Sequence, residues 1–171
     1  MASADDQWID AETKIVDAPA DHHDPLRLWL RLFSASRIVE AEVRRRLTRE
    51  FDITLPRFDL LSQLFRVDDG LVLGEISKRL MVSAGNITAI VDRLATEGLI
   101  TRTPDPKDRR VQIIRMTAEG RAYFAKMAEA HEAWIDEMFA GMSPEDTRAL
   151  LGLLGKVKVS ARKALQEVEE S

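Results

Sequence analysis

The chain has 171 residues, of which 45% are hydrophobic and 32% are charged, with a formal net charge of −4 and no cysteine. This length predicts one domain with appendages, and the lack of cysteine excludes disulfides, cysteine-based zinc sites and thiol redox chemistry. No apolar run is long enough to span a membrane and the first residues lack a signal-peptide pattern, so we expect a cytoplasmic protein.

The charge is distributed unevenly along the chain. Residues 1–24 contain seven acidic residues and one lysine, which predicts an acidic, mobile arm, with a short docked helix around Trp8 and Ile15 as the alternative. Residues 76–116 contain eight basic and four acidic residues. Because DNA binding depends on a local basic patch, the acidic overall composition does not exclude a nucleic-acid binder.

The first predicted element is a long helix over residues 25–51, with apolar residues every three or four positions. Its main stripe consists of Leu28, Leu32, Ala35, Val39, Val43, Leu47 and Phe51. A second apolar strip consists of Leu26, Leu30 and Phe33. Two apolar faces need two partners, so we expect this helix to be packed on both faces.

Residues 55–116 are predicted to form a separate lobe of short helices and strands. The pattern indicates helices over residues 55–67, 74–80 and 83–97, an extended piece at 71–73, and strands over 99–103 and 111–116. Ser83 is the expected cap of the third of these helices, and Gly98 is its expected left-handed stop. The two strands are joined by a proline-bounded, basic tip over residues 104–110.

Two more helices complete the predicted fold. Thr117 caps one that runs to about Phe139 with an inward face of Phe124, Ala128, Ile135 and Met138. Ser143 and Pro144 begin the last helix, whose apolar positions are Leu150, Leu151, Leu153, Leu154 and Val157. Gly152 and Gly155 in this helix predict a close backbone approach, or else a weakened helix. The expected fold class is mainly α with a small β-wing: a winged helix-turn-helix domain plus a helical dimerisation region.

The helix over residues 83–97 has a composition that suits double-stranded DNA. Its outward residues are Ser83, Ala84, Gly85, Asn86, Thr88, Ala89 and Arg93. Small and hydrogen-bonding side chains let a helix backbone approach base edges in the major groove, where Asn86 can pair with adenine. The hairpin tip adds Lys107, Arg109 and Arg110, which suit phosphates or a minor groove. Arg93 and Arg102 are equally consistent with ordinary solvated surface. Asp92 is equally consistent with a local pair to Arg93.

The motifs in this region resemble those of MarR-family repressors. The resemblance lies in Asp92-Arg93-Leu94 near the helix end, the following Glu97-Gly98, the wing sequence Asp108-Arg109-Arg110 and Thr117-Ala-Glu-Gly120, with Met116 where the family has leucine. It implies an obligate homodimer built from the first and last helices, with residues 25–54 and 117–171 as the helical dimerisation region. It also implies that Asp92 orients Arg110 while Arg109 lies nearer the tip. Two such helices in a dimer would read a pseudo-palindromic operator.

The same resemblance implies a small-molecule effector, commonly an aromatic acid. Residues 82–88 resemble the subgroup that controls hydroxycinnamate breakdown, some of whose members respond to aromatic acyl-CoA thioesters, which points to aromatic compound catabolism. The candidate ligand residues are Trp29, Arg31, Phe33, Arg37 and Phe58. Aromatic residues at these spacings are more often part of a core than of a ligand site.

No catalytic, cofactor or metal signature is present in the sequence. His22, His23 and His131 lack metal-ligand spacing, and no carboxylate pair lies beside a candidate nucleophile. We therefore expect no enzyme and no cofactor. The alternatives to a ligand-released repressor are a constitutive or architectural DNA binder and a protein-interaction module without effector.

Overall fold

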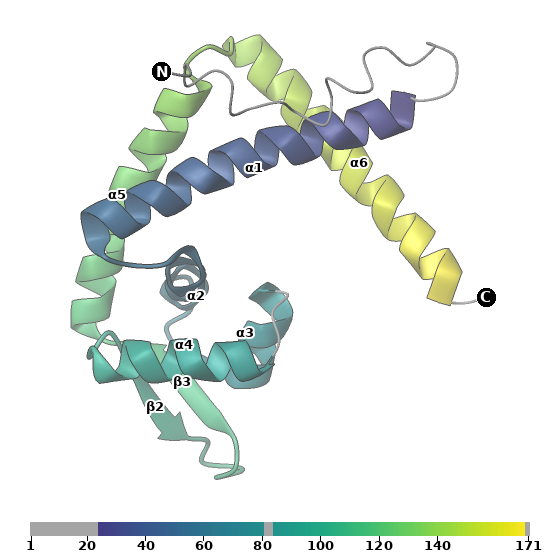
Figure 1. The fold of residues 1–171 in the computed structure, drawn as a ribbon. Helices are drawn as coiled ribbons and strands as arrows, with labels where there is room; N and C mark the ends of the chain where they lie inside the picture. The colour runs from purple at the N-terminus through teal and green to yellow at the C-terminus, as the bar shows by residue number, and fades with distance from the viewer. Residues whose placement is uncertain (1–23, 81–83, 170–171) are drawn as a thin grey trace, which may run out of the picture. The chain divides into compact units, whose positions relative to one another are not determined.

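The structure, a computed structural model, describes residues 24–80 and 84–169 (Figure 1). The predicted acidic arm and the Ser83 cap lie outside the described residues. The chain divides into two compact units, one up to His131 and one from Glu132, and the boundary falls within one long helix. The elements in chain order are α1 (Asp24–Phe51), α2 (Leu55–Phe65), β1 (Leu71–Val72), α3 (Leu73–Leu80), α4 (Ala84–Thr96), β2 (Ile100–Pro104), β3 (Gln112–Met116), α5 (Ala118–Phe139) and α6 (Pro144–Glu169).

The predicted fold class is confirmed. A three-stranded antiparallel sheet in the order β1-β3-β2 pairs Leu71 with Ile114 and Ile100 with Met116. In the first unit α2 contacts α3, α4 and β3, so that the short helices and the sheet enclose one core. The fully buried side chains include Leu47, Leu60, Leu61, Leu64, Ile76, Ile87, Val91, Leu94 and Ile114. This core fixes α4 and the hairpin relative to each other, since both contribute to it.

Helix α4 ends where the sequence predicts, at a left-handed glycine. Gly98 has a φ of +74°, and the Gly98 and Leu99 N–H groups donate to the carbonyls of Ala95 and Leu94, each at 3.0 Å. This pattern satisfies carbonyls that the last helical turn would otherwise leave unpaired, and it turns the chain directly into β2.

The start of α5 is held tightly against this turn. The Gly120 N–H donates to Thr117 Oγ1 at 2.9 Å, which confirms the predicted cap. A Cβ atom at Gly120 would lie 2.0 Å from the Leu99 carbonyl oxygen, so only glycine allows this approach. The Tyr123 hydroxyl donates to the Phe51 carbonyl at 2.5 Å, which ties α5 to the end of α1.

The inward face of α5 differs from the prediction. Phe124 is buried as expected, but Met127 is fully buried while Ala128, Ile135 and Met138 are only half-buried. Gly120, Phe124 and Met127 follow steps of four and three, so the face is set by the close approach at Gly120. The apolar pattern of the helix alone did not reveal that constraint.

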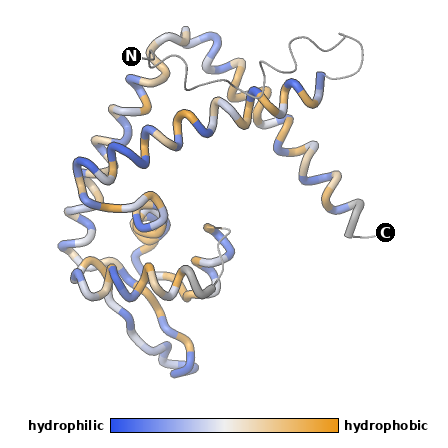
Figure 2. The backbone as a smooth tube through the Cα atoms, viewed as in Figure 1, coloured by the Kyte–Doolittle hydropathy of each residue, from blue (hydrophilic) through white to orange (hydrophobic). Residues whose placement is uncertain are grey.

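Helix α6 begins at the predicted cap. The Asp146 N–H donates to Ser143 Oγ at 3.0 Å, and Ser143 Oγ donates to the Asp146 carboxylate at 2.6 Å. Its leucines at 150, 151, 153 and 154 are exposed by 39%, 65%, 57% and 36% in the single chain. Figure 2 shows hydrophobic stretches recurring along this helix.

Helix α6 contains two glycines among its leucines. At 100° per residue Gly152 lies opposite Leu150 and Leu154, whereas Gly155 lies beside Leu151. A Cβ atom at either glycine would meet no atom within 4 Å. The close backbone approach at these two positions, to the first helix or to a dimer mate, stays a prediction.

Candidate nucleic-acid interface

Helix α4 separates an inner apolar face from an outer polar one. Ile87, Val91 and Leu94 are fully buried against the core of the first unit. On the opposite face Thr88, Ala89, Asp92 and Arg93 are exposed. The backbone of Ala84, Gly85 and Asn86 forms the first turn of α4, but their side chains are outside what the structure describes, as is all of Ser83. The predicted base contacts of these four residues stay predictions.

The hairpin between β2 and β3 ends in a tip shaped by two aspartates. The Lys107 N–H donates to Asp105 Oδ1 at 2.7 Å, and the Arg110 N–H donates to Asp108 Oδ1 at 3.0 Å. Carboxylates that accept from the backbone two residues on are turn formers. Asp108, which was also a candidate DNA-binding residue, shapes the tip in this way, and its contact with DNA stays a prediction.

The three predicted cations of the tip point into solvent. Lys107 and Arg109 are exposed and have no acidic partner among the residues that the structure describes. The Arg110 side chain is 96% exposed, with its Nε 3.7 Å from Asp108 Oδ1. A pair this open contributes little to stability, so the fold itself does not require the three basic side chains.

The predicted pair between Asp92 and Arg110 is wrong. Asp92 Oδ1 instead accepts a hydrogen bond from the guanidinium of Arg102. Arg102 is the third residue of β2, which follows α4 after a tight turn and therefore passes beside its last turns. Arg110 lies at the far end of the hairpin. The sequence left Arg102 open between a functional role and ordinary solvated surface, and in the structure its side chain links the wing to α4.

A second ionic group at the end of α4 was not predicted. Glu97 Oε1 accepts from Arg93 Nε at 2.8 Å, and Glu97 Oε2 accepts from the Arg57 guanidinium. Burial, together with the positive charge of Arg93, lowers the pKa of Arg57. The spacing of four between Arg93 and Glu97 is a recognisable helical pair. The position of Arg57 in α2 gave no comparable signal.

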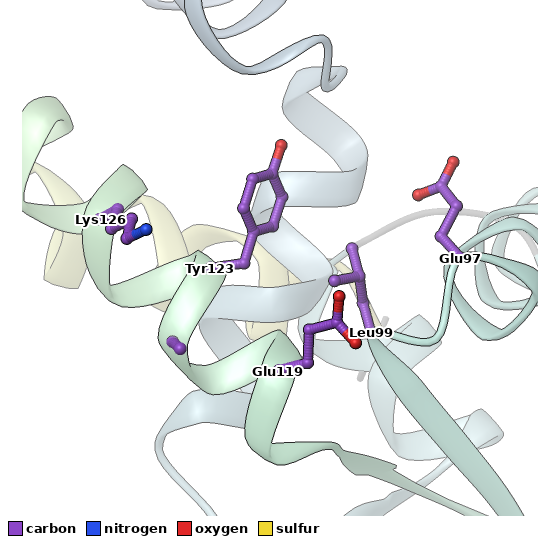
Figure 3. Close-up of a pocket in the computed structure, with 6 residues that line it drawn as sticks. Glu97, Leu99, Glu119, Tyr123 and Lys126 are labelled. Carbon is purple, nitrogen blue, oxygen red and sulfur yellow. The ribbon is translucent and has the colours of Figure 1, made fainter.

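A shallow cavity of about 370 Å³ lies next to this group, between the end of α4 and the start of α5 (Figure 3). Its lining residues are Glu97, Leu99, Glu119, Ala122, Tyr123 and Lys126. Burial raises the pKa of the Tyr123 hydroxyl, which is already committed to the Phe51 carbonyl. None of these residues was predicted to bind a ligand.

The predicted ligand residues do not come together in one place. Trp29 and Phe33 contact each other on α1, with ring centroids 5.6 Å apart, and are 55% and 48% exposed. Arg37 Nη1 lies 3.9 Å from the Glu40 carboxylate, and Arg31 is exposed on the same helix.

Phe58 is a core residue and not part of that cluster. It is 7% exposed, and its ring centroid lies 5.3 Å from that of Phe124 and 5.1 Å from that of His131. Burial lowers the pKa of His131. The core alternative is therefore correct for Phe58.

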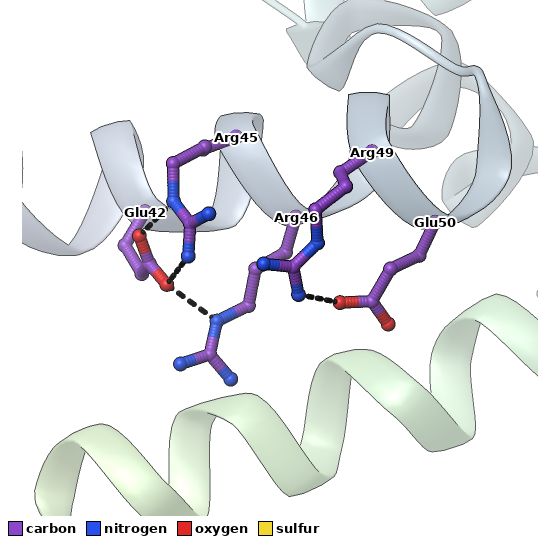
Figure 4. Close-up of polar contacts among 5 residues, drawn as sticks. All are labelled: Glu42, Arg45, Arg46, Arg49 and Glu50. Carbon is purple, nitrogen blue, oxygen red and sulfur yellow. Dashed lines mark hydrogen bonds and ion pairs between the residues drawn. The ribbon is translucent and has the colours of Figure 1, made fainter.

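The arginines of α1 form a helix face that is neutralised by its own glutamates (Figure 4). Arg45 and Arg46 both donate to Glu42, at 2.7 and 2.5 Å, and hold the pKa of that carboxyl at about 2. Arg49 donates to Glu50. These contacts favour a solvated ion-pair network over an anion site.

Two further features bear on function. Among the described residues, no group of histidines and carboxylates has an arrangement that could hold a metal ion. In the same part of the chain, no helix is both long and apolar enough to cross a membrane.

Comparison with known proteins places this geometry in context. Residues 53–111 match the model of the MarR family. The chain is 33% identical over 93 residues to the uncharacterised HTH-type transcriptional regulator YkoM of Bacillus subtilis, an alignment that covers 54% of this chain and 60% of YkoM. The chain thus spans less than two thirds of this relative.

Solved structures share the fold. The transcriptional regulator BldR of Sulfolobus solfataricus superposes with a TM-score of 0.72 at 25% identity, covering 83% of this chain and 99% of BldR. CouR of Rhodococcus jostii RHA1, solved with p-coumaroyl-CoA, superposes with a TM-score of 0.67 at 21% identity, covering 81% of this chain and 95% of CouR. The relatives are named as regulators and not as enzymes. These comparisons show that residues 53–111 are similar to the MarR family and that the chain shares its fold with transcriptional regulators of known structure.

Proposed function

We propose that this chain is a sequence-specific DNA-binding transcriptional repressor that acts as a homodimer and is released from its operator by a small aromatic ligand. The observation that carries the proposal is the pairing of an exposed polar face on α4 with a hairpin tip bearing Lys107, Arg109 and Arg110. Helix α4 would lie in the major groove, and the tip would contact phosphates or the adjacent minor groove.

The proposed dimer is supported by apolar surface that a single chain leaves in water. On α1 these side chains include Leu26, Leu28 and Ile38, and on α6 they include Leu151 and Leu153. Contiguous exposed apolar residues of this kind mark association surfaces. A two-fold dimer would present two copies of α4 to successive turns of a pseudo-palindromic operator.

The first prediction concerns sequence reading by α4. Thr88→Ala and Asn86→Ala should each weaken binding to the preferred operator by about 1–3 kcal/mol while leaving binding to random duplex nearly unchanged, because base-edge contacts carry the discrimination. Competition binding assays with both duplexes measure the ratio of operator affinity to random-duplex affinity. Thr96→Ala, at the other end of the same exposed face, is the matched control and should leave the ratio unchanged. Equal losses on both duplexes would reduce Thr88 and Asn86 to phosphate contacts.

The proposed effector is an aromatic carboxylate or its CoA thioester. The support from this chain is the Trp29–Phe33 ring pair, with Arg31 and Arg37 on the same helix to meet carboxylate or phosphate oxygens. CouR, which has this fold, binds p-coumaroyl-CoA. Phe58 is left out of the proposed site because it is buried in the core.

The second prediction is that such a ligand binds the protein and releases it from DNA. To shift the protein from 99% in its DNA-binding state to 99% in a state that does not bind DNA, the ligand must bind the second state about 10⁴-fold more tightly. Calorimetry with p-coumarate and p-coumaroyl-CoA, paired with titration of the operator complex, measures both steps. Trp29→Ala should weaken ligand binding, whereas Phe139→Ala, which removes another partly exposed aromatic ring, should not. A complex that stays intact at millimolar ligand would favour the constitutive DNA binder.

A further inference from the structure

The carboxylate of Glu97 is divided between two arginines from different helices. One oxygen accepts from Nε of Arg93, at 2.8 Å, and the other accepts from the guanidinium of Arg57 in the first turn of α2. The backbone of Glu97 is fixed as well, since its N–H donates to the Arg93 carbonyl at 3.1 Å and the left-handed Gly98 follows. Both the backbone and the carboxylate of Glu97 are therefore fixed in position.

This arrangement requires the guanidinium of Arg57 to be largely removed from solvent, which costs free energy. Its side chain is only 14% exposed, and its Nε is buried without a hydrogen-bond partner. A buried ion pair stabilises a fold little compared with apolar side chains of the same volume, and an unsatisfied donor adds a further cost. Stability alone thus does not account for a buried guanidinium at this position.

The other end of the group lies on the proposed DNA face. Arg93 is 71% exposed, and Glu97 engages the Nε edge of its guanidinium. The two Nη groups have no partner among the described residues, so this forked edge of Arg93 is available to a phosphate. Arginine loses less entropy on binding when its fork is already oriented.

We propose that Arg57 and Glu97 are positioning residues that orient the guanidinium of Arg93 toward a DNA phosphate. This inference rests on the proposed DNA binding. Arg57 anchors the carboxylate of Glu97 from the core side, and the carboxylate turns the Nε edge of Arg93 inward. The Nη groups then face outward beside α4, in addition to the three cations of the wing tip.

The effect of Glu97→Gln on DNA affinity distinguishes two roles of Glu97, because the two roles predict changes in opposite directions. If Glu97 acts only as a negative charge near DNA, Glu97→Gln should tighten binding, because it removes repulsion of the phosphates. If Glu97 positions Arg93, the same change should weaken binding about 3- to 10-fold and lower the salt dependence by about one phosphate contact. The readout is the Kd, over a range of salt concentrations, for a duplex that the wild-type protein selects from a random pool.

Three further variants complete the experiment. In an Arg93→Ala background, Glu97→Gln should no longer weaken binding. The double variant Arg57→Met/Glu97→Gln leaves no lone buried charge and should fold, as thermal unfolding will show, yet still bind as weakly as Glu97→Gln. Glu40→Gln breaks another pair with an arginine four residues on, at 2.6 Å to Arg44, and should not change binding.

The outcomes separate this inference from the proposed function. Wild-type protein that binds no duplex would overturn both. Wild-type binding that is lost in Arg93→Ala but unchanged or tighter in Glu97→Gln would overturn only the positioning roles of Arg57 and Glu97.

Discussion

Replacing both Arg109 and Arg110 by alanine is expected to weaken operator binding about 50-fold at 0.1 M salt. Each arginine that neutralises a phosphate contributes about 0.9 to the slope of log K against log salt, so the double variant should also lower the slope by about two. The loss should be nearly the same on operator and random duplex, because phosphate contacts carry no sequence information. Fluorescence anisotropy over a salt series measures both quantities.

The structure explains why this variant should keep its fold. The backbone of the tip is shaped by Asp105 and Asp108, whose carboxylates accept the N–H groups of Lys107 and Arg110, and those contacts do not involve the arginine side chains. The matched control is Lys126→Ala/Lys158→Ala, which removes two exposed cations outside the winged lobe. Should this control lose as much affinity and slope as the tip variant, the effect would come from net charge and the wing would have no special role.

Most of the fold could be predicted because its signals are local. Gly98 adopts the left-handed conformation, Ser143 and Thr117 cap their helices, and the proline-bounded basic segment forms the hairpin tip. Each of these outcomes depends on a few neighbouring residues whose backbone preferences the sequence displays directly.

The errors lie where an outcome depends on contacts between elements. Asp92 has several arginines within reach along the sequence, and only the tight turn into β2 decides that Arg102 is its partner. The inward face of α5 is set by the approach of Gly120 to the Leu99 carbonyl. Both depend on distances across the fold, which helical periodicity does not contain.

Dependence on contacts between elements also explains why the role of Arg57 was missed and why Phe58 was misjudged as a ligand residue. They are adjacent in α2, and one meets Glu97, forty residues away, while the other meets Phe124 and His131. Phe58 was grouped with the aromatic residues and arginines of α1 because a ligand cleft was expected there, but its ring is buried in the core. Residue type alone does not separate a core ring from a ligand contact.

The largest expected effect concerns the leucine stripe of α6. Leu150→Asp/Leu154→Asp should convert a dimer into monomers at micromolar concentration and reduce operator affinity at least about 100-fold. Burying one leucine side chain contributes about 1.5–3 kcal/mol, and each substitution occurs twice in a two-fold interface, where a buried carboxylate adds a further cost. Light scattering coupled to size exclusion reports the mass, and titration of full-length and half-site duplexes reports the coupling of the two half-sites.

A control on the same helix isolates the apolar surface from the added charge. Lys156→Gln/Gln166→Asp changes the net charge by the same amount at exposed positions away from Leu150 and Leu154 on the helix, and should remain dimeric. The substituted leucines are 39% and 36% exposed in the single chain, and helix α6 keeps its Ser143 cap, so the monomers should retain their helical content by circular dichroism. A variant with both aspartates that stays dimeric and binds the full operator normally would rule out this face of α6 as the dimer interface. The apolar residues of α1, from Leu26 to Ile38, would then be the remaining surface to test by the same substitutions.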